Sequence, residues 1–169
     1  LISNYIESTS IEVQEQVDSN INVSYENKDI QNNKLQYTSI LEIPSINLKE
    51  GLVDSTNNFS SIQYAVSIDK SSNYPDRNGN FILYAHSGNC YFSFFRNLNK
   101  VNLKDYVFIY FNGVKYNYEI IDKYDIKKSG KANIVSSNNE RYITLITCDP
   151  NKEGYQIVLV GILKSTSLY

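Results

Sequence analysis

The 169-residue chain has one histidine, two cysteines and three prolines, and it has neither methionine nor tryptophan. Two cysteines are too few for a disulfide framework, and with one histidine they are too few for a four-ligand zinc site. The longest apolar run, residues 157–163, is far shorter than the roughly 18 residues that a membrane-spanning helix needs. We therefore expect no structural metal and no membrane span within this chain.

The sequence also has no large excess of positive or negative charge. Sixteen lysines and arginines stand against eighteen aspartates and glutamates, which leaves a net charge of -2. A protein that neutralises a phosphate backbone needs a basic excess, so we expect no nucleic-acid partner. With 41% hydrophobic and 20% charged residues, the composition is typical of a chain that folds, and the length fits one globular domain.

Composition divides the chain into two parts. Residues 1–38 are rich in Asn, Gln, Glu and Ser, and the thin apolar stripe of Ile11, Val13 and Val17 predicts a weak helix in a polar arm. Residues 39–169 carry the apolar patterns expected of the folded domain. Because the sequence has no methionine, we expect a processed or truncated piece whose signal or membrane anchor lay upstream.

Short β-rich runs separated by turn residues fill the second part. The clearest signal is a hairpin, in which residues 107–111 and 114–121 flank Asn112-Gly113. About eight short strands with a few short helices predict a mainly-β chain folded as a closed or nearly closed barrel. Further strands are expected around Pro44 within 41–48 and over 81–85, 142–147 and 156–163, with short helices before Ala65 and over 91–98.

Two residues suited to acyl transfer lie at predicted strand ends. His86 follows the run 81–85, and an imidazole both takes and gives a proton near neutral pH. Cys148 follows the run 142–147 where the chain enters a polar loop, so its thiol is expected to be accessible. On adjacent strand ends the two residues form a nucleophile and its base. A structural histidine and a structural cysteine are the alternative.

The contexts of these residues resemble the sortase family of bacterial cysteine transpeptidases. Residues 144–148, TLITC, resemble the TLxTC signature that ends in the family's nucleophile, and residues 79–86 resemble its histidine strand. Residues 92–98 are similar to the segment after the histidine, and residues 43–46, IPSI, to the first strand of the barrel. The resemblance covers residues 40–164 and implies the closed sortase-type β-barrel.

The resemblance also implies a reaction. Cys148 would attack the Thr–Gly carbonyl of an LPxTG-like sorting signal and form a thioacyl enzyme. His86 would protonate the leaving amine and then deprotonate an acceptor amine on peptidoglycan, on a pilin or on another surface protein. Thr147, Ala85 and Tyr84 would line the peptide groove. No cofactor or metal is implied, and the domain would act on the extracellular face of the bacterial membrane, anchored N-terminally.

One position departs from the family pattern. Sortases generally carry an arginine at the start of the strand after the cysteine, where this chain reads Tyr155-Gln156. Counting back from Val160-Gly161 places Gln156 at the arginine position, with Tyr155 one register slip away. A neutral amide stabilises an oxyanion less than a guanidinium does, and Arg77 or Lys152 are candidate substitutes. The departure favours an alternative function, a low-activity or inactive sortase-fold protein that binds peptides.

A second thiol and a basic loop complete the candidate residues. Cys90 lies four residues after His86 and is either a partly buried loop residue or a redox partner of Cys148. Lys127, Lys128 and Lys131 form a loop without carboxylates, so we expect no calcium there.

The class within the family is predicted by elimination. The segment between the hairpin and the cysteine strand is too short for the long helix of class B, and no Asp-Pro-aromatic lid of class C is present. Class A, D or E is therefore expected. A cysteine protease of another fold is disfavoured, because no long helix is predicted to carry the cysteine.

Overall fold

The computed structural model describes residues 36–54 and 65–169. Within these ranges the regular structure is almost entirely β, with two short 3-10 helices, η1 (Pro44–Ile46) and η2 (Leu98–Lys100). No helix in this part of the chain is long and apolar enough to cross a membrane. The strands are β1 (Ser39–Ile43), β2 (Leu48–Val53), β3 (Val66–Ile68), β4 (Gly79–Tyr84), β5 (Tyr106–Phe111), β6 (Val114–Lys127), β7 (Arg141–Cys148) and β8 (Tyr155–Leu168).

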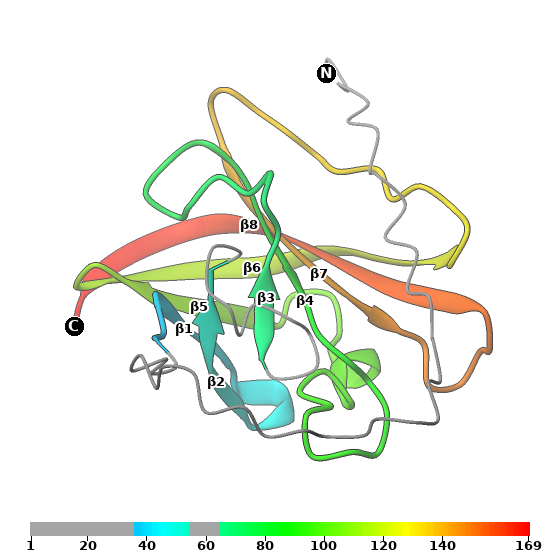
Figure 1. Ribbon diagram of the computed structural model, residues 1–169. Coiled ribbons are helices and arrows are strands. Elements are labelled where there is room, and N and C mark those ends of the chain that lie inside the picture. The colour runs from blue at the N-terminus through cyan, green and yellow to red at the C-terminus, as the bar shows by residue number, and fades with distance from the viewer. Residues whose placement is uncertain (1–35, 55–64) are drawn as a thin grey trace, which may run out of the picture.

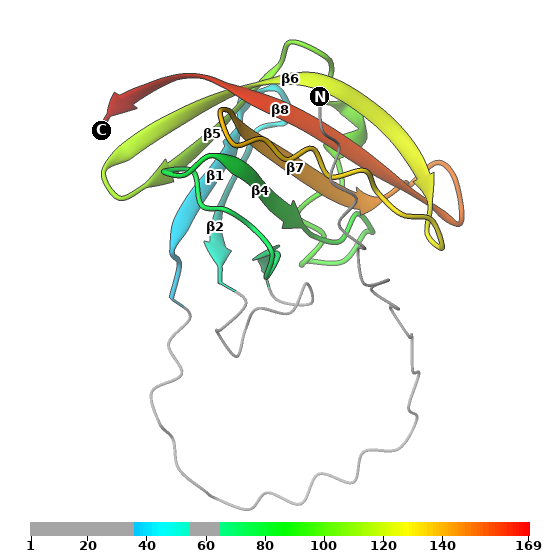
Figure 2. The same ribbon diagram turned by 90° about the horizontal axis from the view of Figure 1, so that it is seen from above.

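The eight strands close into one barrel in the order β1-β2-β3-β4-β7-β8-β6-β5, with β5 pairing back onto β1 (Figures 1 and 2). The β2·β3 and β4·β7 pairs are parallel, and the others are antiparallel. Closure leaves no long unpaired edge to recruit another chain. The predicted fold class, a mainly-β closed barrel of about eight strands, is confirmed.

The predicted hairpin is also confirmed, and its strands are longer than the sequence pattern indicated. Phe111 pairs with Val114 across a two-residue turn in which Asn112 has φ 50° and Gly113 has φ 76°. Two consecutive positive φ values twist the chain in the sense that the flanking strands require. Asn and Gly tolerate this conformation best, which is why the dipeptide predicted the turn.

The helix predicted over residues 91–98 is wrong. This segment forms successive turns in which Ser93 N donates to Cys90 O at 3.1 Å and Arg96 N donates to Ser93 O at 3.1 Å. Phe95 N instead reaches back to His86 O at 2.9 Å, which interrupts the repeat that an α-helix needs. The helices expected in the polar arm and before Ala65 lie outside the described residues.

The side chains of β4, β7 and β8 alternate between the inner and the outer face of the barrel. On β7, Ile143 and Leu145 are fully buried in the core. Successive side chains of a strand point to opposite faces, so Ile146 and Cys148 lie on the outer face. The corresponding inward-facing core residues of the neighbouring strands are Phe81 and Leu83 on β4, and Ile157 and Leu159 on β8.

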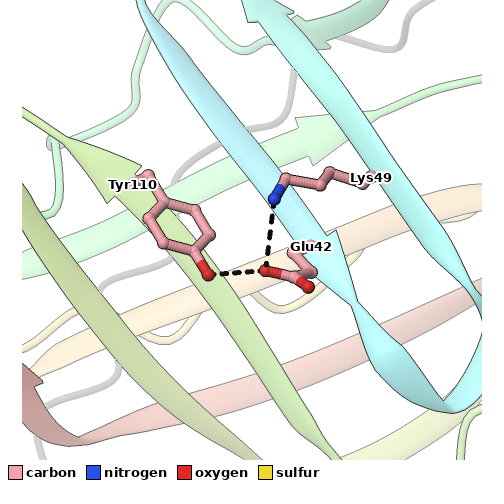
Figure 3. Close-up of polar contacts among 3 residues, drawn as sticks. All are labelled: Glu42, Lys49 and Tyr110. Atoms are coloured by element: carbon pink, nitrogen blue, oxygen red, sulfur yellow. Dashed lines mark hydrogen bonds and ion pairs between the residues drawn. The ribbon is translucent and has the colours of Figure 1, made fainter. Parts of the chain in front are cut away.

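The seam at which the barrel closes, between β1 and β5, is cross-linked on its outer face. Tyr110 OH donates to Glu42 Oε2 at 2.6 Å, and Lys49 Nζ of β2 lies 4.0 Å from the same carboxylate oxygen (Figure 3). The hydrogen bond to Glu42 raises the pKa of Tyr110 to about 12. The Glu42 carboxylate therefore links β1 both to its neighbour β2 and to β5, which is distant in sequence.

We predict that Tyr110→Phe lowers the free energy of unfolding by about 1 kcal/mol, because it removes a charge-assisted hydrogen bond that is partly exposed. Urea denaturation checks this. Since the pKa of Tyr110 is raised in the folded state, the hydroxyl's contribution is full below pH 10 and declines as the pH rises toward 12. Tyr106→Phe is the matched control, since its hydroxyl lies 3.5 Å from Glu119 at an exposed site. Equal losses in the two variants would contradict this role of Tyr110.

Candidate active site

The parallel pairing of β4 with β7 brings the predicted histidine and cysteine together. The ladder runs in register from Gly79↔Arg141 to Tyr84↔Ile146. Two residues beyond that last pair, the chains reach His86 and Cys148. The two strands lie side by side and point the same way in both views (Figures 1 and 2). Residues far apart in sequence thus meet at one edge of the sheet.

Two further hydrogen bonds hold the chains together past the end of the ladder. Thr147 Oγ1 donates to Ala85 O at 2.6 Å, and Ala85 N donates to Ile146 O at 3.4 Å. His86 is held from its other side, because its carbonyl accepts the Phe95 N–H at 2.9 Å. The backbone that carries the imidazole is therefore fixed on both sides.

The imidazole and thiol are both half-buried, and Cys148 forms no disulfide. Half-burial leaves a thiol open to a peptide while excluding part of the surrounding water. Nucleophilic acyl transfer by a cysteine requires an accessible thiol and a base carried within reach of it, and the strand register brings the backbones of these two residues together.

Gln156 is the residue directly opposite Cys148. The two form the last pair of the antiparallel β7·β8 ladder, so their side chains share the outer face. Gln156 is half-buried and offers an amide N–H group. Tyr155 precedes Gln156 on the same strand and points to the opposite face. Of the two positions predicted for the missing arginine, Gln156 is therefore the one beside the thiol.

The structure describes contacts for both cationic substitutes proposed from the sequence. Arg77 lies before β4, at the end of the strand opposite His86, where its backbone N–H donates to Tyr74 O at 2.9 Å. Lys152 Nζ sits 3.7 Å from the ring centroid of Tyr155 and 3.9 Å from Asp125 Oδ2, on the face away from Cys148. Neither contact directs a positive charge toward the thiol.

Two of the three residues expected to line the peptide groove face the core instead. Thr147 is 3% exposed and Ala85 is 5% exposed, because the alternation of side chains along β7 and the end of β4 directs both of them toward the inner face. They support the strand ends and present no side-chain surface to a peptide. Tyr84 lies on the outer face and is half-buried, and burial raises its pKa, with a smaller contribution from Asp69.

The outer face beside Cys148 carries three apolar residues that the sequence analysis missed. Ile146 pairs with Val158, which pairs with Tyr124 on β6, and Gln156 pairs with Ile126. Ile146, Tyr124 and Ile126 are half-buried. Together with Tyr84 they make an apolar floor next to the thiol, which we call the outer floor. The sequence could have identified Ile146, because it lies two residues before Cys148 and alternate residues of a strand share a face.

The connection between β6 and β7, residues 128–140, crosses this outer face (Figure 2). Asn80 Nδ2 donates to Val135 O at 2.8 Å and to Thr144 Oγ1 at 2.9 Å, and Tyr124 OH donates to Asn133 O at 3.2 Å. Thr144 is fully buried beneath this connection. The accessible part of the outer face is therefore the part nearest Cys148.

Cys90 lies in the loop after His86 and is exposed rather than partly buried. Its Sγ is 3.0 Å from Ser93 Oγ, and this hydrogen bond lowers the pKa of the Cys90 thiol. Both cysteines are free thiols. Among the residues that the structure describes, no group of three or more His, Cys, Asp or Glu side chains is placed to hold a metal ion.

Comparison with known proteins connects this geometry to a family. The family model for the sortase domain matches residues 41–163. Sortase D of Bacillus subtilis (strain 168) is 28% identical over 115 residues, which cover 68% of this chain and 56% of that protein. The chain thus spans little more than half the length of this curated relative.

Solved structures share the fold at lower identity. Sortase C of Streptococcus pneumoniae superposes with a TM-score of 0.69 at 18% identity, over 79% of this chain and 72% of that one. Sortase A of Corynebacterium diphtheriae gives 0.70 at 18% identity, over 78% and 62%. Sortase A of Listeria monocytogenes gives 0.67 at 22% identity, over 79% and 90%. Because the sortase domain matches residues 41–163, well over half of the chain, this chain belongs to the sortase family.

Proposed function

We propose that this protein is a cysteine transpeptidase that cleaves an LPxTG-like sorting signal between Thr and Gly and transfers the acyl group to an amine. The observation that carries the proposal is the convergence of His86 and Cys148 at the ends of two parallel, hydrogen-bonded strands. In this assignment Cys148 is the nucleophile and His86 is the general acid and base.

In the first half-reaction the thiolate of Cys148 attacks the carbonyl carbon of the Thr–Gly bond. A C–S bond forms, the C–N bond breaks, and His86 gives its proton to the leaving glycine amine. A tetrahedral oxyanion precedes this collapse, and the Gln156 amide beside the thiol is the neighbouring side-chain donor. The products are a thioacyl enzyme and a peptide that begins with glycine.

In the second half-reaction an acceptor amine attacks the thioester carbon. The new C–N bond forms, the C–S bond breaks, and His86 takes the proton released by the amine. A thioester retains enough acyl-transfer potential for an amine to capture it. Half-burial of Cys148 and the apolar outer floor limit the competing attack by water.

The substrates follow from the family and from the surface beside the thiol. An extended sorting-signal peptide fits an apolar strand face better than a polar one, and the outer floor supplies Tyr84, Ile146 and Tyr124. The acceptor is an amine of peptidoglycan or of a pilin or other surface protein. We place the enzyme on the extracellular face of a bacterial membrane, attached through a segment N-terminal to the barrel, and in class A, D or E.

Gln156 supports a second candidate function. A neutral amide where sortases generally carry an arginine weakens oxyanion stabilisation while leaving peptide binding intact. The alternative is therefore a sortase-fold protein of low or no activity that binds sorting-signal peptides.

The proposal predicts that fluorogenic LPxTG-type peptides are cleaved and that Cys148→Ala abolishes cleavage. An added amine, such as a glycine peptide, is expected to divert the product from acid to ligated amide, which mass spectrometry of the products measures. Cys90→Ala is the matched control, because it removes the other, exposed thiol and is expected to keep cleavage. Peptide binding without cleavage by the parent protein would favour the binding protein instead.

We also predict that Gln156→Arg raises kcat/KM for peptide cleavage by roughly 10- to 100-fold, because a guanidinium opposite Cys148 stabilises the oxyanion more strongly than an amide. Tyr155→Arg carries the same new charge on the opposite strand face and controls for charge alone. If both variants changed the rate equally, the placement of Gln156 beside the reacting carbonyl would be wrong.

A further inference from the structure

β2 carries a carboxylate on its core-facing side. In the β1·β2 ladder Glu50 pairs with Leu41, and Leu48 pairs with Ile43. Leu41 and Ile43 are fully buried in the core, and paired residues share a face, so Glu50 and its neighbour Leu52 point inward. An inward-facing Glu between two leucines departs from the apolar pattern that a barrel interior requires.

The carboxylate of Glu50 has no partner within residues 36–54 and 65–169, where neither a hydrogen bond nor an ion pair engages it. It is half-buried, and burial raises its pKa. Lys49 points to the other face, toward Glu42. Partial removal of a charge from water is costly unless a partner compensates it.

Glu50 opens into a groove of about 480 Å³ between the start of β2 and the loop that follows His86. The groove is walled by the rings of Tyr37, Tyr91, Phe92 and Phe94. Tyr91 is 84% exposed and packs edge-on against Phe92 at 5.1 Å. The ring of Tyr37 lies where a side chain at Gly51 would be, so the glycine makes room for this wall.

Among the described residues that line the groove, Arg96 is the cationic one, and it donates hydrogen bonds to the loop itself. The Arg96 guanidinium donates through Nε to Ser93 O at 3.2 Å and through Nη2 to Cys90 O at 2.9 Å. These bonds direct the guanidinium toward the loop carbonyls, and within the described residues no ion pair joins it to Glu50. The Glu50 carboxylate is therefore the anionic group of the groove that an incoming cation would pair with.

Aromatic faces next to a carboxylate recognise organic cations, because the ring quadrupole attracts a cation and the carboxylate accepts its hydrogen bonds. A metal ion would need more oxygen ligands than this groove offers, since no group of three acidic, His or Cys side chains occurs in the described ranges. The volume suits a ligand of a few residues.

The groove is connected to the catalytic histidine through the loop that forms one of its walls. Phe95, which lies between groove residues Phe94 and Arg96, donates its N–H to His86 O at 2.9 Å. In Figure 1 this loop and the η1 turn lie at the end of the barrel where β4 and β7 terminate.

We propose that this groove binds an ammonium-bearing segment of the acceptor peptide, with Glu50 pairing to the cation and the rings of Tyr37, Tyr91 and Phe92 packing around it. The inference rests on the proposed transpeptidase function and adds a site for the second substrate. Glu50 is a binding residue here, and it takes no part in bond formation at Cys148.

The test is calorimetric titration of the Cys148→Ala protein with a short lysine-containing peptide and with the same peptide acetylated on the lysine Nε. We expect the free-amine peptide to bind, and Glu50→Gln in the same background to weaken its binding by about tenfold. The acetylated peptide is expected to bind the two proteins equally weakly. Tyr91→Ala is expected to weaken binding several-fold, and because its side chain is almost fully exposed the variant should fold.

Glu119→Gln is the matched control, since it removes a carboxylate on the outer face of β6 whose ion pair with Lys164 is long, at 3.9 Å. Binding that is unchanged in Glu50→Gln, or reduced equally in Glu119→Gln, would overturn the proposal. In the enzyme with Cys148 intact, Glu50→Gln is expected to raise the KM for the acceptor and to leave peptide hydrolysis unchanged. Absence of cleavage by the parent enzyme would refute transpeptidation alone, because the titration does not depend on cleavage.

Discussion

The parallel pairing of β4 with β7 is the constraint on which the site depends. Parallel strands end at the same edge of a sheet, so a histidine after one strand and a cysteine ending the other are brought together by backbone hydrogen bonds alone. The chain between β4 and β7 forms β5 and β6. β5 pairs with β1 and so closes the barrel, and the Tyr110–Glu42 hydrogen bond stabilises this pair of strands.

Strand parity then decides which chemistry each face can support. Inner-face residues such as Leu145 and Thr147 are buried, and the Thr147 hydroxyl joins the two strand ends through its hydrogen bond to Ala85 O. Outer-face residues of the same strands include Cys148, the opposed Gln156 and the half-buried apolar Ile146. A preorganised site on rigid strands loses little free energy to reorganisation during reaction.

Much of this arrangement was predictable from local sequence. Asn112-Gly113 defines its hairpin through backbone conformation, and the polar residues after Cys148 indicate a strand end, so both features are readable without tertiary information. The residues that line the expected peptide groove beside Cys148 were harder to predict. β4 and β7 are apolar on both faces, so their sequence patterns do not distinguish inward-facing from outward-facing residues. Ala85 and Thr147 were assigned to the groove for that reason, and the structure places them in the core.

Other features depend on contacts that no local pattern encodes. The turns over residues 91–98 arise because Phe95 bonds His86, a long-range choice that overrides the helical spacing of the aromatic residues. The inward direction of Glu50 follows from its pairing with Leu41, which requires the β1·β2 register. Lys152 was a reasonable substitute for the missing arginine by distance along the chain, but it lies in the loop between β7 and β8 with its ammonium over the Tyr155 ring.

The most direct measurement of the central claim is intact-mass spectrometry of the protein mixed with a sorting-signal peptide without amine and quenched in acid. The account predicts a mass increase equal to the acyl fragment ending in Thr, located by proteolysis on Cys148 and absent from the more exposed Cys90. The adduct should disappear when an amine is added. With cleavage established, an adduct on Cys90, or turnover with no Cys148 adduct under any quench, would contradict the account.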